Sequence, residues 1–168
     1  MTPLSKIGIT MGDPSGVGPE IIVKALKEMS PEHRSASAVI GNFDLLKRAD
    51  KLVGAGLTYV ESLEAASGGA VPVVHVATKD QGQIRDGELS AAGGEAAYQY
   101  VAKAVELALA KRIAVIVTAP LNKGAMHAAG HHFDGHTELL AHLTGAKSSF
   151  MLLASDKLPA PCTLAPGA

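Results

Sequence analysis

The strongest constraint on the fold of this 168-residue sequence is the alternation of short aliphatic runs with longer amphipathic runs. Short runs rich in Val and Ile predict strands, and apolar residues spaced three and four apart predict helices. The run Ile113–Val117 is aliphatic throughout, which is typical of a strand covered on both faces. The alternation predicts an α/β layered fold with a largely parallel sheet.

The predicted elements follow one another with few long connections. The predicted strands are Lys6–Met11, Ala38–Ile40, Thr58–Val60, Pro72–Ala77, Ile113–Val117 and Ser149–Ala154. The predicted helices are Pro19–Met29, Phe43–Val53, Ser90–Lys111, Asn122–Ala129 and His136–Leu143. The last ten residues, 159–168, contain three prolines and a glycine. Because proline breaks helices and central strands, we expect a tail without regular structure there.

Composition excludes several classes of protein. Apolar residues make up 47% of the chain and charged residues 18%, which predicts a globular protein. A formal net charge of −1 gives no electrostatic footprint for nucleic acid or an anionic membrane. The single cysteine, Cys162, excludes an internal disulfide framework. With no signal-peptide pattern and no run long enough to span a membrane, we expect a cytoplasmic protein.

The first motif is glycine-rich and runs from Gly12 to Glu20, between a predicted strand and a predicted helix. Glycines there let a ligand approach the backbone, and the following helix offers free N–H groups to an anion. The spacing matches neither the dinucleotide-binding fingerprint nor the P-loop. Asp13 could belong to a ligand-binding site. The alternative is that its side chain only caps the turn.

The second motif follows the aliphatic strand and reads Val117-Thr-Ala-Pro-Leu-Asn-Lys-Gly124. Ligands of open α/β sheets bind at the carboxyl ends of the strands, where Asn122 and Lys123 would reach a phosphate or carboxylate. The alternative is that Asn122 is an ordinary helix cap and Lys123 a solvated residue of the first turn.

A histidine cluster is the third motif. It comprises His127, His131, His132 and His136. Imidazoles suit zinc, so one hypothesis is a small metal hydrolase built on these four side chains. Against it, Gly130 is expected to end the helix between the first two, and no H-E-x-x-H motif is present.

The string Gly135-His-Thr-Glu138 closes that cluster. Thr137 is expected to cap the following helix, whose free N–H groups favour an anion. His136 would donate a hydrogen bond to substrate oxygens.

Taken together, the three strings are more specific than any one alone. Ile9-Thr-Met-Gly-Asp-Pro-Ser-Gly-Val-Gly-Pro-Glu-Ile21 resembles the opening of the 4-hydroxythreonine-4-phosphate dehydrogenase family. The second motif and Gly130-His-His-Phe-Asp-Gly-His-Thr-Glu138 resemble its next landmarks in order, and the match extends from about Lys6 to about Leu158. The last two strings also resemble a sister branch that oxidises 4-phosphorylated threonate or erythronate.

The resemblance implies a fold like those of isocitrate and isopropylmalate dehydrogenases. It implies a homodimer that oxidises a phosphorylated hydroxy acid with NAD, followed by loss of carbon dioxide. It also implies a divalent metal (zinc, magnesium or manganese) acting as a Lewis acid. The family's substrate-binding His-Thr pair falls on His136 and Thr137, while Asp13 and Lys123 are further candidates for the site.

The sequence departs from the family after about residue 158. The three metal-ligating histidines of the family would come later, yet no histidine follows His142. We therefore expect residues 1–158 to be an incomplete amino-terminal portion of the dehydrogenase and 159–168 a non-family tail, as after truncation or a frameshift. No metal ligand is assigned to the chain. A non-catalytic fragment that retains affinity for phosphate esters is an alternative.

An incomplete parallel sheet would leave apolar side chains uncovered. We expect Val115, Val117 or Met151 to lie under elements that are absent, and the isolated chain to be poorly stable or to aggregate.

Overall fold

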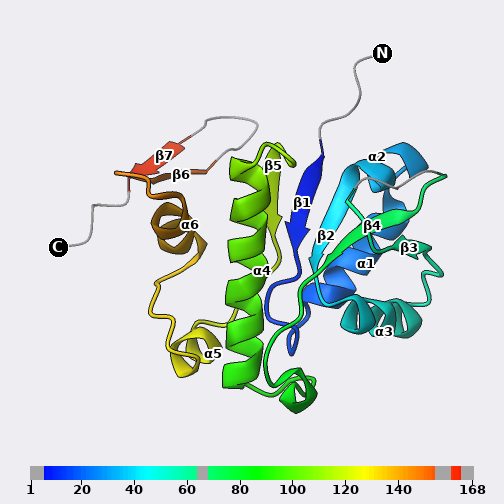
Figure 1. Ribbon diagram of the computed structural model, residues 1–168, viewed down its shortest axis with the longest axis horizontal. Helices are drawn as coiled ribbons and strands as arrows, with labels where there is room; N and C mark the ends of the chain where they lie inside the picture. The colour runs from blue at the N-terminus through cyan, green and yellow to red at the C-terminus, as the bar shows by residue number, and fades with distance from the viewer. Residues whose placement is uncertain (1–5, 64–67, 154–159, 164–168) are drawn as a thin grey trace.

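The core of the fold is a five-stranded parallel sheet (Figure 1). The computed structural model describes residues 6–63, 68–153 and 160–163. The strands are β1 (Ile7–Thr10), β2 (Ser37–Gly41), β3 (Tyr59–Val60), β4 (Val71–His75) and β5 (Val115–Thr118). Their spatial order is β3-β4-β2-β1-β5, with β1 paired to both β2 and β5. The predicted α/β fold with a parallel sheet is confirmed.

Helices cover both faces of the sheet. The long helices are α1 (Gly18–Glu28), α3 (Phe43–Val53) and α4 (Ala91–Leu109). Shorter ones are α2 (Pro31–Ala36), the 3-10 turn η1 (Gln81–Gln83), α5 (Lys123–Ala128) and α6 (His136–Thr144). Figure 1 shows α4 lying along β5 and β1, with α5 and α6 on its far side. None of the helices in the described ranges is long and apolar enough to cross a membrane.

Alternation along the strands divides the core between the two faces. Ile9, Val39 and Val73 pack with the buried side chains of α1 and α3. Ala38 and Ile40 point to the opposite face, where Ala104 and Leu107 of α4 are buried with them.

Local signals account for where the helices begin and end. The Asn42 side chain accepts a hydrogen bond from Leu45 N at 2.9 Å and caps α3, and Gly54 ends that helix with φ +66°. Ser90 caps α4 in the same way, through Gly93 N at 3.1 Å. Helix α2 was not predicted, although Ser30 before a proline at the first helical position is a usual start signal.

Strand β5 differs from its prediction. It lies at the edge of the sheet, and Val115 and Val117 are 52% and 46% exposed. The expectation that both faces are covered is therefore wrong in this structure, whereas the expectation that these two valines lie uncovered is confirmed. An aliphatic run shows that a strand suits burial, but it does not show that a covering element is present.

The carboxyl-terminal end of the described chain also differs. Strand β6 (Phe150–Leu153) pairs antiparallel with β7 (Ala160–Thr163) in a separate two-stranded sheet. The expectation of no regular structure after residue 158 is wrong for residues 160–163, because a strand with a free edge tolerates proline. Residues 164–168 and the Met151 side chain lie outside what the structure describes.

Candidate functional site

The glycine-rich turn after β1 packs directly against the segment after β5. Gly12 has φ +70°, and a Cβ there would lie 2.2 Å from the carbonyl oxygen of Pro120. The same oxygen accepts a hydrogen bond from Asp13 N at 3.0 Å. Glycine is therefore required for both conformation and space, and the contact joins the carboxyl ends of two neighbouring strands.

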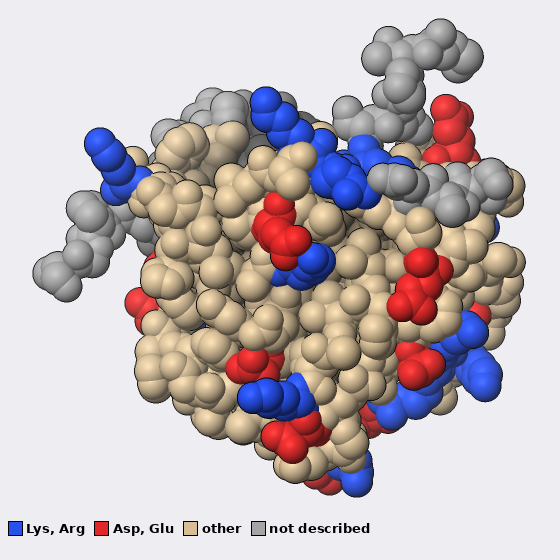
Figure 2. Space-filling view, viewed as in Figure 1, with Lys and Arg blue, Asp and Glu red and all other residues tan. Residues whose placement is uncertain are grey.

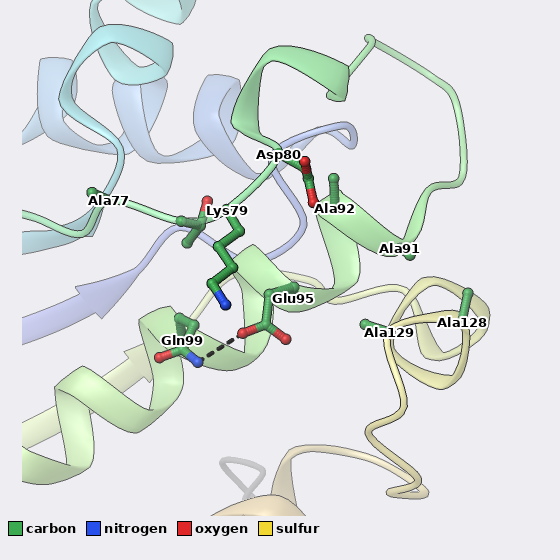
Figure 3. Close-up of a pocket in the computed structure, with 10 residues that line it drawn as sticks. Ala77, Lys79, Asp80, Ala91, Ala92, Glu95, Gln99, Ala128 and Ala129 are labelled. Atoms are coloured by element: carbon green, nitrogen blue, oxygen red, sulfur yellow. Dashed lines mark hydrogen bonds between the residues drawn. The ribbon is translucent and has the colours of Figure 1, made fainter.

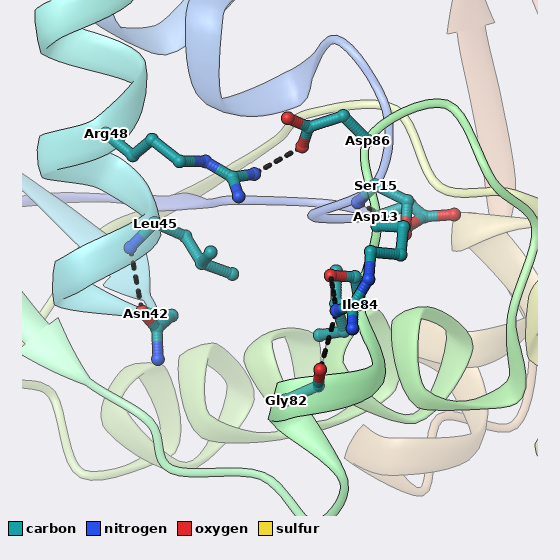
Figure 4. Close-up of polar contacts among 9 residues, drawn as sticks. Asp13, Ser15, Asn42, Leu45, Arg48, Gly82, Ile84 and Asp86 are labelled. Carbon is teal, nitrogen blue, oxygen red and sulfur yellow. Dashed lines mark hydrogen bonds and ion pairs between the residues drawn. The ribbon is translucent and has the colours of Figure 1, made fainter.

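Asp13 is only 5% exposed and has a clear structural role. Its Oδ1 accepts a hydrogen bond from Ser15 N at 2.9 Å (Figure 4), so the turn-capping interpretation of this residue is confirmed. Asp13 also lines a small cavity of about 110 Å³ together with Ser15, Glu88 and Asn122. The structure thus brings Asp13 and Asn122, from two separate motifs, to one place.

At the second motif, the structural alternative is confirmed. The Asn122 side chain accepts a hydrogen bond from Ala125 N at 3.1 Å and caps α5. Lys123 is exposed on the first turn of that helix. Gly94 of α4 fixes the position of α5, because a Cβ there would lie 2.0 Å from the carbonyl oxygen of Ala125.

His136 is the first residue of α6 and lies beside the end of β5. Its ring forms a hydrogen bond with the backbone of Ala119, and its Nε2 is buried without a partner. Burial lowers the pKa of His136 and outweighs the Ala119 hydrogen bond, which raises it. The neutral form of the ring is therefore favoured, and none of the described residues bonds its Nε2.

Thr137 occupies the first turn of α6 but does not cap it. The cap position belongs to Gly135, which provides no side-chain hydrogen bond. The prediction that Thr137 is the cap is wrong by two positions. Because the cap is a glycine, no cap side chain accepts a hydrogen bond from the first N–H groups of α6, which favours an anion.

The histidine cluster does not form a metal site. His131 Nε2 lies 2.7 Å from Glu95 Oε2, and His127 Nε2 lies 3.4 Å from the carbonyl oxygen of Phe133. Within the described ranges, which include all four histidines, no group of three or more His, Cys, Asp or Glu side chains could hold a metal ion. The hypothesis of a small metal hydrolase is therefore contradicted.

The polar loop between β4 and α4 lies over the glycine-rich turn. Gly87 N donates a hydrogen bond to the carbonyl oxygen of Ser15 at 2.7 Å. An ion pair between Arg48 of α3 and Asp86 fixes the loop on its other side (Figure 4). Ile84 anchors the loop in the core at 4% exposure.

A larger open cleft of about 670 Å³ lies at the carboxyl end of β4. Its walls come from the loop after β4, the first turns of α4 and the end of α5 (Figure 3). Lys79 from the loop and Glu95 and Gln99 from α4 point into it. Sequence reasoning missed Glu95, whose one signal is that it is the only charged residue in the alanine- and glycine-rich first turns of α4.

The charged side chains on the face drawn in Figure 2 do not gather into a patch of one sign. Figure 2 shows acidic and basic side chains interspersed over the visible face. This distribution agrees with a net charge of −1 and gives no reason to expect a polyanionic partner on that face.

These features define a class of protein: an open α/β sheet with polar groups gathered where parallel strands end, the usual place for ligands in such folds. The family model described as pyridoxal phosphate biosynthetic protein PdxA matches residues 33–163. The chain belongs to the PdxA family.

Individual relatives support this assignment. The chain is 43% identical to a D-threonate 4-phosphate dehydrogenase from Cupriavidus necator, over 92% of this chain and 47% of the relative. It is 40% identical to a 4-hydroxythreonine-4-phosphate dehydrogenase from Trichlorobacter lovleyi, over 94% and 48%. The chain spans about half the length of the curated relatives it matches.

A solved structure agrees as well. A 4-hydroxythreonine-4-phosphate dehydrogenase from Burkholderia phymatum superposes with a TM-score of 0.83 at 42% identity, covering 94% of this chain and 49% of the other. The fold similarity therefore covers nearly the whole described chain.

Proposed function

We propose that this chain is the substrate-holding part of a PdxA-family dehydrogenase, and that the whole protein oxidises a 4-phosphorylated hydroxy acid with a nicotinamide cofactor. The substrate class follows the names of the relatives, D-threonate 4-phosphate and 4-hydroxythreonine-4-phosphate. The observation that carries the proposal is the Nε2 atom of His136, which is buried near the end of β5 and has no hydrogen-bond partner.

In this proposal, His136 and Thr137 bind the substrate. A neutral His136 ring that donates to the Ala119 carbonyl has an acceptor at Nε2, which suits a substrate hydroxyl group. This proposal replaces the donor role that the sequence predicted for His136. The Thr137 hydroxyl and the first N–H groups of α6 suit a carboxylate or phosphate oxygen. Asp13 and Lys123 are the less supported candidates for substrate binding. Asp13 supports the glycine-rich turn, and Lys123 is exposed.

A divalent metal does not fit the residues described here. The chain offers no group of three ligating side chains within those ranges, so no chemical step is routed through a metal on this chain. At Gly12, the glycine-rich turn packs against the Pro120 carbonyl oxygen, so the space beside this glycine is occupied by the chain itself. Metal, NAD and a homodimeric partner belong to the proposal for the whole protein, through its resemblance to the family.

The test is NADH formation by the purified chain with NAD and a divalent metal. The substrates are D-threonate 4-phosphate and 4-phosphohydroxy-L-threonine in separate reactions, with the unphosphorylated acids as controls. Binding of a phosphorylated acid without turnover supports a substrate-holding part. Metal-dependent turnover would show that the chain supplies the ligands that we do not find. A folded chain that neither binds nor oxidises either acid would contradict the proposal.

A further inference from the structure

Two side chains join the loop before α6 to helix α4. His131 Nε2 lies 2.7 Å from Glu95 Oε2, and the side chains are 22% and 32% exposed. The His131 ring also stacks on Tyr98, with centroids 3.7 Å apart and planes 6° from parallel. Gln99 Nε2 donates to the other Glu95 oxygen at 2.8 Å (Figure 3).

Glu95 accepts these hydrogen bonds as a carboxylate. Burial opposes its ionisation, but hydrogen bonds from His131 and Gln99 outweigh burial and hold the pKa of Glu95 below its ordinary value. The carboxylate is therefore ionised near neutral pH and accepts strong hydrogen bonds.

The contact lies in the short segment between α5 and α6. Other contacts also attach this segment: His131 N donates to Met126 O at 2.9 Å, and His127 Nε2 lies 3.4 Å from Phe133 O. Gly130 follows the end of α5 and has φ +89°, and α6 begins at His136. Between them, His131 makes the hydrogen bond to Glu95 and the stack on Tyr98, while the Phe133 ring lies 6.5 Å from the Tyr98 ring. The next firmly buried residue is Leu139, which packs with Val101 of α4.

We propose that Glu95 and His131 are positioning residues: their contact, completed by the stack on Tyr98, holds residues 130–135 against α4 and so places His136 and Thr137 at the end of β5. The contact itself is independent of any ligand. Its effect on substrate affinity rests on the function proposed above.

The experiment compares Glu95→Ala, His131→Ala and the double variant with Lys103→Ala. Lys103 pairs with Glu106 at 2.7 Å on the exposed side of the same helix, which makes it a matched control. Glu95→Gln is the rescue variant, because it keeps an acceptor oxygen for the His131 N–H. The readouts are amide hydrogen exchange of residues 130–138, the His136 ring signals by NMR, and the Kd for D-threonate 4-phosphate.

We expect both alanine variants to speed exchange in residues 130–138 about tenfold and to shift the His136 ring signals. The exchange of β1 and β2 should stay unchanged, and the double variant should be no worse than the more affected single variant. Glu95→Gln should recover most of the protection, and Lys103→Ala should resemble the unmodified chain.

The Kd for D-threonate 4-phosphate should rise by about the same factor as the exchange rate. If the unmodified chain does not bind this acid, the proposed function fails, yet the exchange and NMR data still decide the positioning role. Unchanged exchange and unchanged His136 signals in both alanine variants would overturn the inference, as would equal loosening of the whole chain.

Discussion

Gly94 tests how closely α4 and α5 must approach. A Cβ at this position would lie 2.0 Å from Ala125 O and 2.6 Å from Met126 N, and both are backbone atoms. The backbone of α5 cannot rotate away as a side chain would, so the helices must separate by about 1.5 Å to restore ordinary contact distances of about 3.5 Å.

The consequence is a loss of stability despite better helix propensity. Alanine in a helix is favoured over glycine by about 1 kcal/mol. Separating the helices opens the cluster of Val101, Met126 and Leu139, each at most 1% exposed, and overpacking of this kind costs about 3 kcal/mol. We expect Gly94→Ala to lose about 2 kcal/mol net, or about 4–8 °C in Tm.

Urea unfolding followed by circular dichroism measures this change. The control is Gly124→Ala in α5, where the nearest atom to a Cβ is Leu89 Cδ1 at 2.9 Å, on a side chain that is 58% exposed and free to move. That variant should be neutral or slightly more stable. A Gly94→Ala chain as stable as the unmodified one would refute the helix contact described here.

Three further predictions follow from the same structure. Because the pKa of His136 is lowered on folding, its contribution to stability is complete above about pH 6.5 and is lost as pH falls through the folded pKa. His136→Gln should therefore flatten the pH dependence of urea midpoints below about pH 6.5. Asn42→Ala should cost about 1–2 kcal/mol in the same unfolding assay, because it removes the α3 cap at a fully buried position, whereas Ser30→Ala, at the exposed cap of the short helix α2, should cost less. Val117→Lys should reduce aggregation measured by light scattering with little change in Tm, because Val117 is 46% exposed on an edge strand. Equal aggregation of the variant and the unmodified chain would show that β5 is not the surface through which the chain aggregates.

Periodicity in the sequence was sufficient to predict the parallel sheet and the long helices. The limits of α3 agree with the prediction at both ends, because Asn42 and Gly54 are strong local signals. Coverage of β5 could not be predicted, since it depends on which elements pack beside the strand and not on the strand's own residues. Strand β7 was missed because proline rules concern central strands, and its edge position is a tertiary property.

In the candidate site, too, local features could be predicted from the sequence and tertiary contacts could not. Strand-end reasoning predicted that Asn122 and Lys123 follow β5, but it did not indicate that Asn122 shares a cavity with Asp13. The substrate-binding roles of His136 and Thr137 stay predictions. The partnership of His131 with Glu95 was not predictable, because the two residues are 36 positions apart and nothing local links them. Histidine spacing instead suggested a metal site, which the separate contacts of His127 and His131 contradict.

The most direct test of the central claim is the His136 ring signal during titration with D-threonate 4-phosphate, beside D-threonate as the unphosphorylated control. We expect saturable shifts of the His136 signals with the phosphorylated acid and at least tenfold weaker binding by His136→Gln, in a variant shown to be folded by circular dichroism. Saturable binding that leaves the His136 signals unmoved, or that His136→Gln retains in full, would contradict the assignment of the substrate site to the start of α6.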